Sequence, residues 1–131
     1  MKITFLWIGS SKFKEYEQLI ELFKKRLKHY CRFEVISVKE IKQVKNPEDL
    51  KKKEGRSFLS HITSKDHLIL LDESGKLQSS RDLSRSIQNH MNQSQNIVFL
   101  IGGAYGVSKE VFERANQMLS LSKMTLTHWN Y

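Results

Sequence analysis

Cysteine, long apolar runs and internal repeats are the features that this sequence most clearly lacks. Its one cysteine, Cys31, forms no internal disulfide, and because Cys and His residues are not clustered, a structural zinc site is not indicated. No apolar run approaches the roughly 20 residues that cross a bilayer, which excludes a membrane span. Residues 1–9 are apolar but short, and no small-residue cleavage pattern follows them, so they predict a strand rather than a signal peptide. We therefore expect a cytoplasmic protein with no metal or redox role.

The remaining composition is typical of one globular domain. The chain has 131 residues, of which 39% are hydrophobic and 27% are charged. This length suffices for a buried core but is short for two domains, and no linker, repeat or low-complexity segment divides it. We predict a single domain over residues 1–131.

Positive charge is concentrated in the first half of the chain. The formal net charge is +8, and residues 1–60 hold 15 basic and 8 acidic side chains, whereas residues 61–131 hold 7 and 6. Lys and Arg side chains that neutralise phosphates drive nucleic-acid affinity, so this asymmetry is consistent with a polyanionic partner. It is equally consistent with a basic, soluble surface, and charge alone does not choose between the two.

Apolar runs that suit buried strands alternate with segments of helical periodicity. Residues 12–30 place Tyr16 and Phe23 on one apolar stripe, and Asn46 followed by Pro47 supplies an N-cap and a first-turn proline for a second helix. The alternation predicts an α/β fold, an open and mostly parallel sheet of about five strands with helices on both faces. The expected strands are 2–9, 32–38, 67–71 with a turn at Ser74–Gly75, 96–103 and one within 118–126, and the expected helices are 12–30, 47–62, 79–94 and 108–116.

The carboxyl ends of the strands are where such a sheet binds ligands. Three loops then become the candidate site: the loop after Leu71, the loop after Ile101 and the segment around Leu121–Leu126. The second of these holds Gly102, Gly103 and Gly106. Their spacing differs from the G-x-G-x-x-G dinucleotide turn, and the Lys-Ser/Thr of a phosphate loop is missing. Two interpretations stay open: a tight structural turn, or a main chain that approaches an adenine or ribose closely.

Five short motifs together resemble one family. They are "MKIT" with Gly9, "KEG" at Lys53–Gly55, "LLDESGK" at Leu70–Lys76, "FLIGGAYGVSKEV" and "LSLSKMTL". On these motifs the chain is similar, over almost its whole length, to the pseudouridine N3-methyltransferases of the ribosomal large subunit. These enzymes belong to the SPOUT class, which has an α/β trefoil-knot fold.

The resemblance implies S-adenosylmethionine as methyl donor. It implies a pseudouridine of 23S ribosomal RNA as acceptor, and a homodimer that acts on the assembled 70S ribosome. It leaves the catalytic base unassigned. Matched position by position, the donor contacts fall on Leu71, Gly102, Leu121, Ser122, Lys123, Met124, Thr125 and Leu126.

The sequence departs from the family pattern near its end. Thr127 stands where the family has proline, His128 is retained, and the family's last helix does not follow, so we expect an incomplete C-terminal knot segment. The first hypothesis is a ribosomal RNA methyltransferase. The second is a basic RNA- or ribosome-binding α/β domain without catalysis, and the third is a flavodoxin-like phosphate binder.

Several further residues have a structural and a functional interpretation. Lys51, Lys52 and Lys53 suit either a solvated helix face or phosphate contacts, and both interpretations stay open. The others favour structural roles: core packing for Trp7, Tyr16 and Phe23, turn capping for Asp72 and Glu73, helix capping for Ser10, Ser79 and Ser108, and a helix–strand junction for Cys31.

Overall fold

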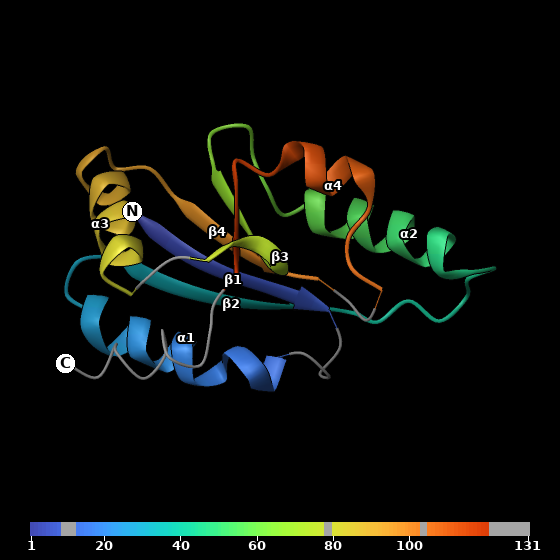
Figure 1. Ribbon diagram of the computed structural model, residues 1–131, viewed down its shortest axis with the longest axis horizontal. Coiled ribbons are helices and arrows are strands. Elements are labelled where there is room, and N and C mark those ends of the chain that lie inside the picture. The colour runs from blue at the N-terminus through green and yellow to red at the C-terminus, as the bar shows by residue number, and fades with distance from the viewer. Residues whose placement is uncertain (9–12, 78–79, 103–104, 121–131) are drawn as a thin grey trace.

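Strands and helices alternate along the part of the chain that the computed structural model describes, residues 1–8, 13–77, 80–102 and 105–120 (Figure 1). The β-α-β-α-β-α-β-α-β order predicted from the sequence is confirmed. The elements are β1 (Lys2–Ile8), α1 (Phe13–Leu27), β2 (Arg32–Val38), α2 (Pro47–Leu59), β3 (His67–Leu77), α3 (Ser80–Asn92), β4 (Ile97–Ile101), α4 (Lys109–Arg114) and β5 (Gln117–Ser120).

The strands form one parallel sheet in the order β2-β1-β4-β3-β5. Every residue of β4 is buried, as expected for a central strand covered on both faces. Because all pairs are parallel, the strand ends gather at two edges, an amino edge and a carboxyl edge. The predicted fold class, a parallel α/β sheet with helices on both faces, is confirmed.

Two helices cover each face of the sheet. On one face, α1 and α3 pack against an apolar cluster in which the rings of Phe5 and Phe99 stack with centroids 5.0 Å apart. On the other face, Phe58 of α2 and Val111 of α4 enter a second cluster, and Figure 1 shows these two helices side by side. The core positions predicted for Trp7, Tyr16 and Phe23 are confirmed in the first cluster.

The third strand differs from the prediction. A strand was expected to end at Leu71 before a turn at Ser74–Gly75, but β3 continues to Leu77. Its pairing with β5 shifts register on the way, so that Leu71 and Lys76 both face Leu119. A Cβ on Gly75 would lie 2.8 Å from the backbone of Leu119, so only glycine lets the two backbones pass this closely. The turn that Asp72 and Glu73 were expected to cap is therefore replaced by strand.

Several helix and strand ends also differ by a few residues. Helix α1 ends at Leu27 rather than at residue 30, because the N–H groups of Tyr30 and Cys31 both bond to the Leu27 carbonyl in a tight turn. Helix α2 ends at Leu59 rather than at residue 62, because the N–H groups of His61 and Ile62 bond to carbonyls three residues earlier instead of four. Strand β4 ends at Ile101, before the glycines. Within the described residues, no helix is long and apolar enough to span a membrane.

Polar side chains tie the amino edge of the sheet together. The Arg114 guanidinium, at the end of α4, donates to the carbonyls of Thr63 and Asp66 at 2.8 Å each and to the amide oxygen of Asn116 at 2.9 Å. The same Asn116 oxygen accepts the N–H of Leu68 at 2.8 Å. These bonds join the α2–β3 loop to the start of β5 and fix the register at which β3 and β5 begin.

Candidate functional site

The carboxyl edge brings two of the expected donor-contact residues together. Leu71 pairs in register with Ile101 of the neighbouring strand, and Gly102 follows Ile101 directly. On its other side Leu71 pairs with Leu119, and β5 ends one residue later, at Ser120. The remaining expected contacts, Leu121, Ser122, Lys123, Met124, Thr125 and Leu126, lie outside the described residues, as do Thr127 and His128.

The two described residues differ in what they offer a ligand. The Leu71 side chain is 4% exposed and packs in the α1–α3 cluster beside Leu119 and Ile101. Gly102 is also buried, and it contributes only main-chain N–H and C=O groups at the end of β4. The carboxyl edge therefore combines an apolar wall with main-chain hydrogen-bonding groups, which suits the flat, polar-rimmed base of a nucleoside.

The conformation of the glycine turn gives its glycines a structural role. A Cβ on Gly102 would lie 3.0 Å from Cγ1 of Val107, because the chain folds back tightly over this position. Gly106 has φ of +86°, a left-handed conformation that side chains disfavour. The tight-turn interpretation is thus supported at both positions, and Gly103 lies outside the described residues.

Ser108 caps the helix that follows the turn, as predicted. Its hydroxyl accepts the N–H of Val111 at 3.3 Å, and the residue is 6% exposed. On its other side Ser108 contacts α2 at Gly55, where an added Cβ would lie 2.5 Å from the Ser108 hydroxyl oxygen. The glycine therefore permits the close approach of α2 to α4. Ser10 and Ser79 lie outside the described residues.

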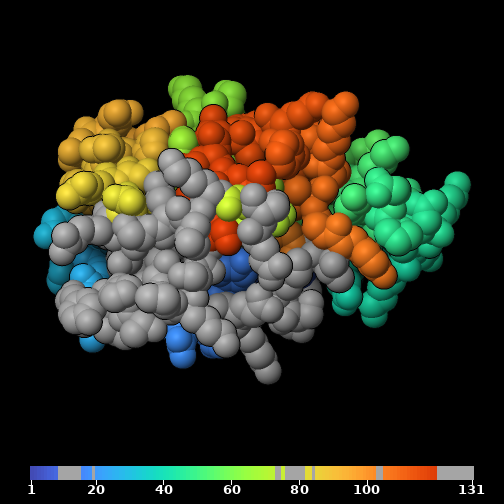
Figure 2. All heavy atoms as spheres, in the orientation of Figure 1, coloured from blue at the N-terminus to red at the C-terminus, as the bar shows by residue number. Residues whose placement is uncertain are grey.

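A groove opens between these two helices. Its volume is about 370 Å³, and its lining residues are Lys52, Arg56, Ser108, Lys109, Glu110 and Glu113. Figure 2 shows the atoms of α4 against those of α2 at one end of the molecule. Three of the lining side chains are cationic and two are anionic. Sequence reasoning missed this groove, although the four-residue spacing of Lys52 and Arg56 was a signal that both lie on one helix face.

The three consecutive lysines of α2 have different surroundings. Lys51 pairs with Glu48, with Nζ 3.0 Å from the carboxylate, and Lys53 pairs with Asp49 at 3.1 Å. The Lys53 ammonium also donates to the carbonyl of Gln43 at 2.9 Å. Lys52 makes no such bond among the described residues and faces the groove. The solvated-face interpretation therefore suits Lys51 and Lys53, and phosphate contact stays open for Lys52.

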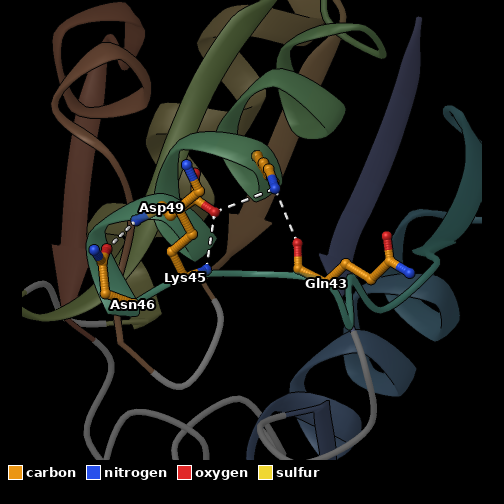
Figure 3. Close-up of polar contacts among 5 residues, drawn as sticks. Gln43, Lys45, Asn46 and Asp49 are labelled. Atoms are coloured by element: carbon orange, nitrogen blue, oxygen red, sulfur yellow. Dashed lines mark hydrogen bonds and ion pairs between the residues drawn. The ribbon is translucent and has the colours of Figure 1, made fainter.

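Asp49 holds the β2–α2 segment against the first turns of α2 (Figure 3). Its carboxylate accepts the backbone N–H of Lys45 at 3.1 Å and pairs with Lys53, while its own N–H donates to the side-chain oxygen of Asn46 at 2.8 Å. The Lys45 N–H, and next the Lys53 ammonium, lower the pKa of Asp49. Asn46 is the N-cap of α2, as predicted, and Pro47 begins the helix.

Glu54 is a buried carboxyl group that sequence reasoning did not single out. It is 6% exposed on α2, one turn before the core residue Phe58. Burial, and then the nearby charge of Glu40, raise its pKa. The sequence signal was present in the helical periodicity, because Glu54 lies on the same face as Phe58.

Other candidate groups do not form a reactive site among the described residues. His, Cys, Asp and Glu side chains do not gather in a group of three that could hold a metal ion there. Cys31 lies half-buried at the α1–β2 junction, as expected, with Sγ 3.7 Å from the Leu27 carbonyl oxygen. Burial raises the pKa of its thiol, which favours the unreactive protonated form.

Comparison with known proteins yields one family and several close relatives. Residues 1–129 match the family described as "Predicted SPOUT methyltransferase". Among relatives named "Ribosomal RNA large subunit methyltransferase H", those of Christiangramia forsetii, Flavobacterium psychrophilum and Flavobacterium johnsoniae are 43%, 42% and 40% identical to this chain over 131 residues. Each alignment covers 98% of this chain and 83% of the relative.

Proposed function

The chain belongs to the SPOUT methyltransferase family, and from this membership we propose that it transfers a methyl group from S-adenosylmethionine to ribosomal RNA of the large subunit. The observation that carries the proposal is the identity of 40–43%, over nearly the whole chain, to relatives named for that activity. The glycine turn beside Leu71 at the carboxyl edge supports it, since parallel α/β sheets bind their ligands at this edge.

The proposed acceptor atom is N3 of a pseudouridine in 23S ribosomal RNA. Methylation at this atom forms an N–C bond, breaks the bond between the methyl group and the sulfonium sulfur of the donor, which leaves as a neutral thioether, and releases the imide proton. The bound donor supplies an already electrophilic methyl group, so holding the acceptor nitrogen in line with that group gives most of the rate. No described side chain is assigned as the base that receives the proton.

The proposed donor site consists of Leu71, Gly102 and the segment Leu121–Leu126. The described part of it fits such a ligand in two respects. Gly102 has no side chain to cover its main-chain N–H and C=O groups at the end of β4, and Leu71 supplies the apolar side of the strand ends. These groups bind and orient a nucleoside and exclude water from it.

We propose that the whole chain acts as one SPOUT domain, in a cytoplasmic homodimer whose substrate is the 70S ribosome. Light scattering coupled to gel filtration measures the oligomer, and a mass of twice 15.4 kDa is the expected result. Methyl transfer that is faster on 70S ribosomes than on separated subunits or free RNA is the expected substrate preference.

The test of function measures donor binding and methyl transfer separately. Calorimetric titration with S-adenosylmethionine and transfer of a labelled methyl group to 70S ribosomes are both expected for the wild-type chain. Gly102→Val is expected to lose both, because its Cβ would crowd Val107 and cover the main chain. Lys25→Ala, an exposed change on α1, serves as control and is expected to keep both.

A non-catalytic ribosome-binding domain is the alternative that the basic side chains of α2 favour. It predicts ribosome binding without donor binding or methyl transfer. No heat of donor binding would therefore exclude the enzyme, and binding with transfer would exclude the alternative.

A further inference from the structure

We propose that the groove between α2 and α4 binds the phosphate backbone of ribosomal RNA through Lys52 and Arg56. The inference rests on the proposed function, which supplies RNA as the partner, and it adds the surface that the RNA contacts. It also separates the lysines of α2 into a binding residue, Lys52, and two structural residues, Lys51 and Lys53.

Lys52 and Arg56 form the cationic side of this groove. They lie four positions apart on one helix, which puts their Cβ atoms about 5–6 Å apart on the same face. Both side chains are exposed, and neither makes an ion pair or side-chain hydrogen bond among the described residues. Two free cations of this kind can each neutralise a phosphate, and the Arg56 guanidinium can do so through two parallel hydrogen bonds.

The α4 side of the groove is of mixed charge. Lys109 lies 3.8 Å from the Glu113 carboxylate, and both side chains are strongly exposed, so solvent and salt weaken this pair. Glu110 adds a second carboxylate. These acids repel phosphate and therefore direct an RNA strand towards α2, where no lining residue is acidic.

The position of the groove places bound RNA next to the proposed donor site. Val107, which contacts the Gly102 position, is followed directly by Ser108, and Ser108 lines the groove. By contrast, the basic residues that end α1 lie on the other face of the sheet. RNA in the groove could thus reach the carboxyl edge, whereas RNA at the end of α1 could not without crossing the sheet.

The two helices that line the groove are held in place before RNA arrives. The Asp49 bonds to Lys45 and Lys53 fasten the segment that precedes α2, and the contact of Gly55 with Ser108 fixes α2 against α4. A groove of fixed shape loses little conformational entropy on binding, so more of the phosphate attraction contributes to affinity.

The experiment compares two double variants with equal loss of charge. Lys52→Ala/Arg56→Ala is expected to weaken binding to purified 70S ribosomes about tenfold and to reduce the slope of log affinity against log salt by about 1.5, since each phosphate contact contributes about 0.7–0.9. Lys25→Ala/Lys28→Ala, at the end of α1, removes two exposed cations from the other face and is expected to change the affinity less than twofold. Donor affinity is expected to be unchanged in both variants.

A third variant tests the sign of the α4 contribution. Glu110→Gln/Glu113→Gln removes the repelling carboxylates and is expected to tighten ribosome binding and steepen its salt dependence. Two results would overturn the inference. One is that Lys25→Ala/Lys28→Ala weakens ribosome binding as much as Lys52→Ala/Arg56→Ala does, and the other is that Lys52→Ala/Arg56→Ala leaves the affinity and the salt slope unchanged. If the wild-type chain binds ribosomes through Lys52 and Arg56 but transfers no methyl group, the proposed function fails and the groove inference stands.

Discussion

Two ionisable residues, one buried and one half-buried, make the stability of this protein depend on pH in opposite directions. Glu54 is buried on α2, where its charged form is unfavourable. His67 is half-buried at the start of β3, with its ring centroid 4.0 Å from that of His90 on α3. Neither residue is at the carboxyl edge, so both effects concern stability rather than methyl transfer.

Glu54→Gln is expected to stabilise the protein at neutral and alkaline pH. The pKa of Glu54 is raised in the folded state, mainly by burial, so its stability contribution is present below the unfolded pKa and is lost as pH rises through the folded pKa. The variant should exceed the wild type by about 1 kcal/mol at pH 8, and the gain should vanish near pH 4. Urea unfolding at both pH values measures this. Glu40→Gln, which removes only the weaker cause, should give a smaller gain, and equal stability at pH 8 would contradict the prediction.

His67 is expected to destabilise the fold in acid. Burial is the main cause that lowers the pKa of His67. The hydrogen bond with Gln117, whose Oε1 lies 3.2 Å from Nε2, raises this pKa, and the charges of His90 and Arg114 lower it further. The stability contribution is therefore complete above the unfolded pKa and is lost as pH falls through the folded pKa. His67→Phe, which has a ring that does not titrate, should lose less stability between pH 7 and pH 5 than the wild type does. Thermal unfolding measures this, with the exposed His29→Ala as control. Identical slopes for all three proteins would refute it.

At the scale of elements, the contact between α2 and α4 turns a favourable helix substitution into an unfavourable one. Alanine normally stabilises a helix interior by about 1 kcal/mol relative to glycine. At Gly55, however, the new Cβ would lie 2.5 Å from the Ser108 hydroxyl oxygen and 3.1 Å from Cγ2 of Val111. Gly55→Ala is therefore expected to destabilise the protein by about 1–3 kcal/mol.

A double-mutant cycle separates this clash from other effects of the substitution. Ser108→Ala alone should cost about 1 kcal/mol through loss of the α4 cap. In that background Gly55→Ala should cost less than it does alone, since the oxygen it meets is gone. Additive free energies of unfolding would show that the two residues do not interact.

The elements themselves follow from the sequence wherever a local pattern determines them. The apolar runs of β1, β2 and β4, and the Asn46 and Ser108 caps, predicted their elements to within one or two residues at most ends. The continuation of β3 could not be predicted, because it depends on Gly75 passing against the backbone of β5, about forty residues later in the chain. Ser74 and Gly75 are ordinary turn residues until that neighbour is known.

At the scale of the whole molecule, the parallel sheet predicts where the backbone is most protected. In the described sheet, β1 and β4 are paired on both sides and buried on both faces, whereas β2 is paired on one side and partly exposed. Amide hydrogen exchange should therefore be slowest in β1 and β4, where opening requires global unfolding, and faster in β2. Exchange as slow in β2 as in β4 would contradict this arrangement.

Part of the candidate site could be predicted from the sequence, because parallel strands bring their carboxyl ends to one edge. Parallel topology, inferred from the alternation of elements, correctly placed Leu71 and Gly102 at one edge. The groove of Lys52, Arg56 and Lys109 could not be inferred, because it depends on how α2 and α4 meet. Local patterns in the sequence indicate where strands lie along the chain and where they end, but not the surface that two helices create together.

The amino-edge bonds of Arg114 and Asn116 have a consequence for how this protein can evolve. They set the register of β3 and β5 at the end of the sheet farthest from the glycine turn. Substitutions that loosen or tighten these bonds therefore act on stability at one edge and leave the loops at the carboxyl edge in place. The two edges of the sheet can therefore change independently, one in the stability it gives and the other in what it can bind.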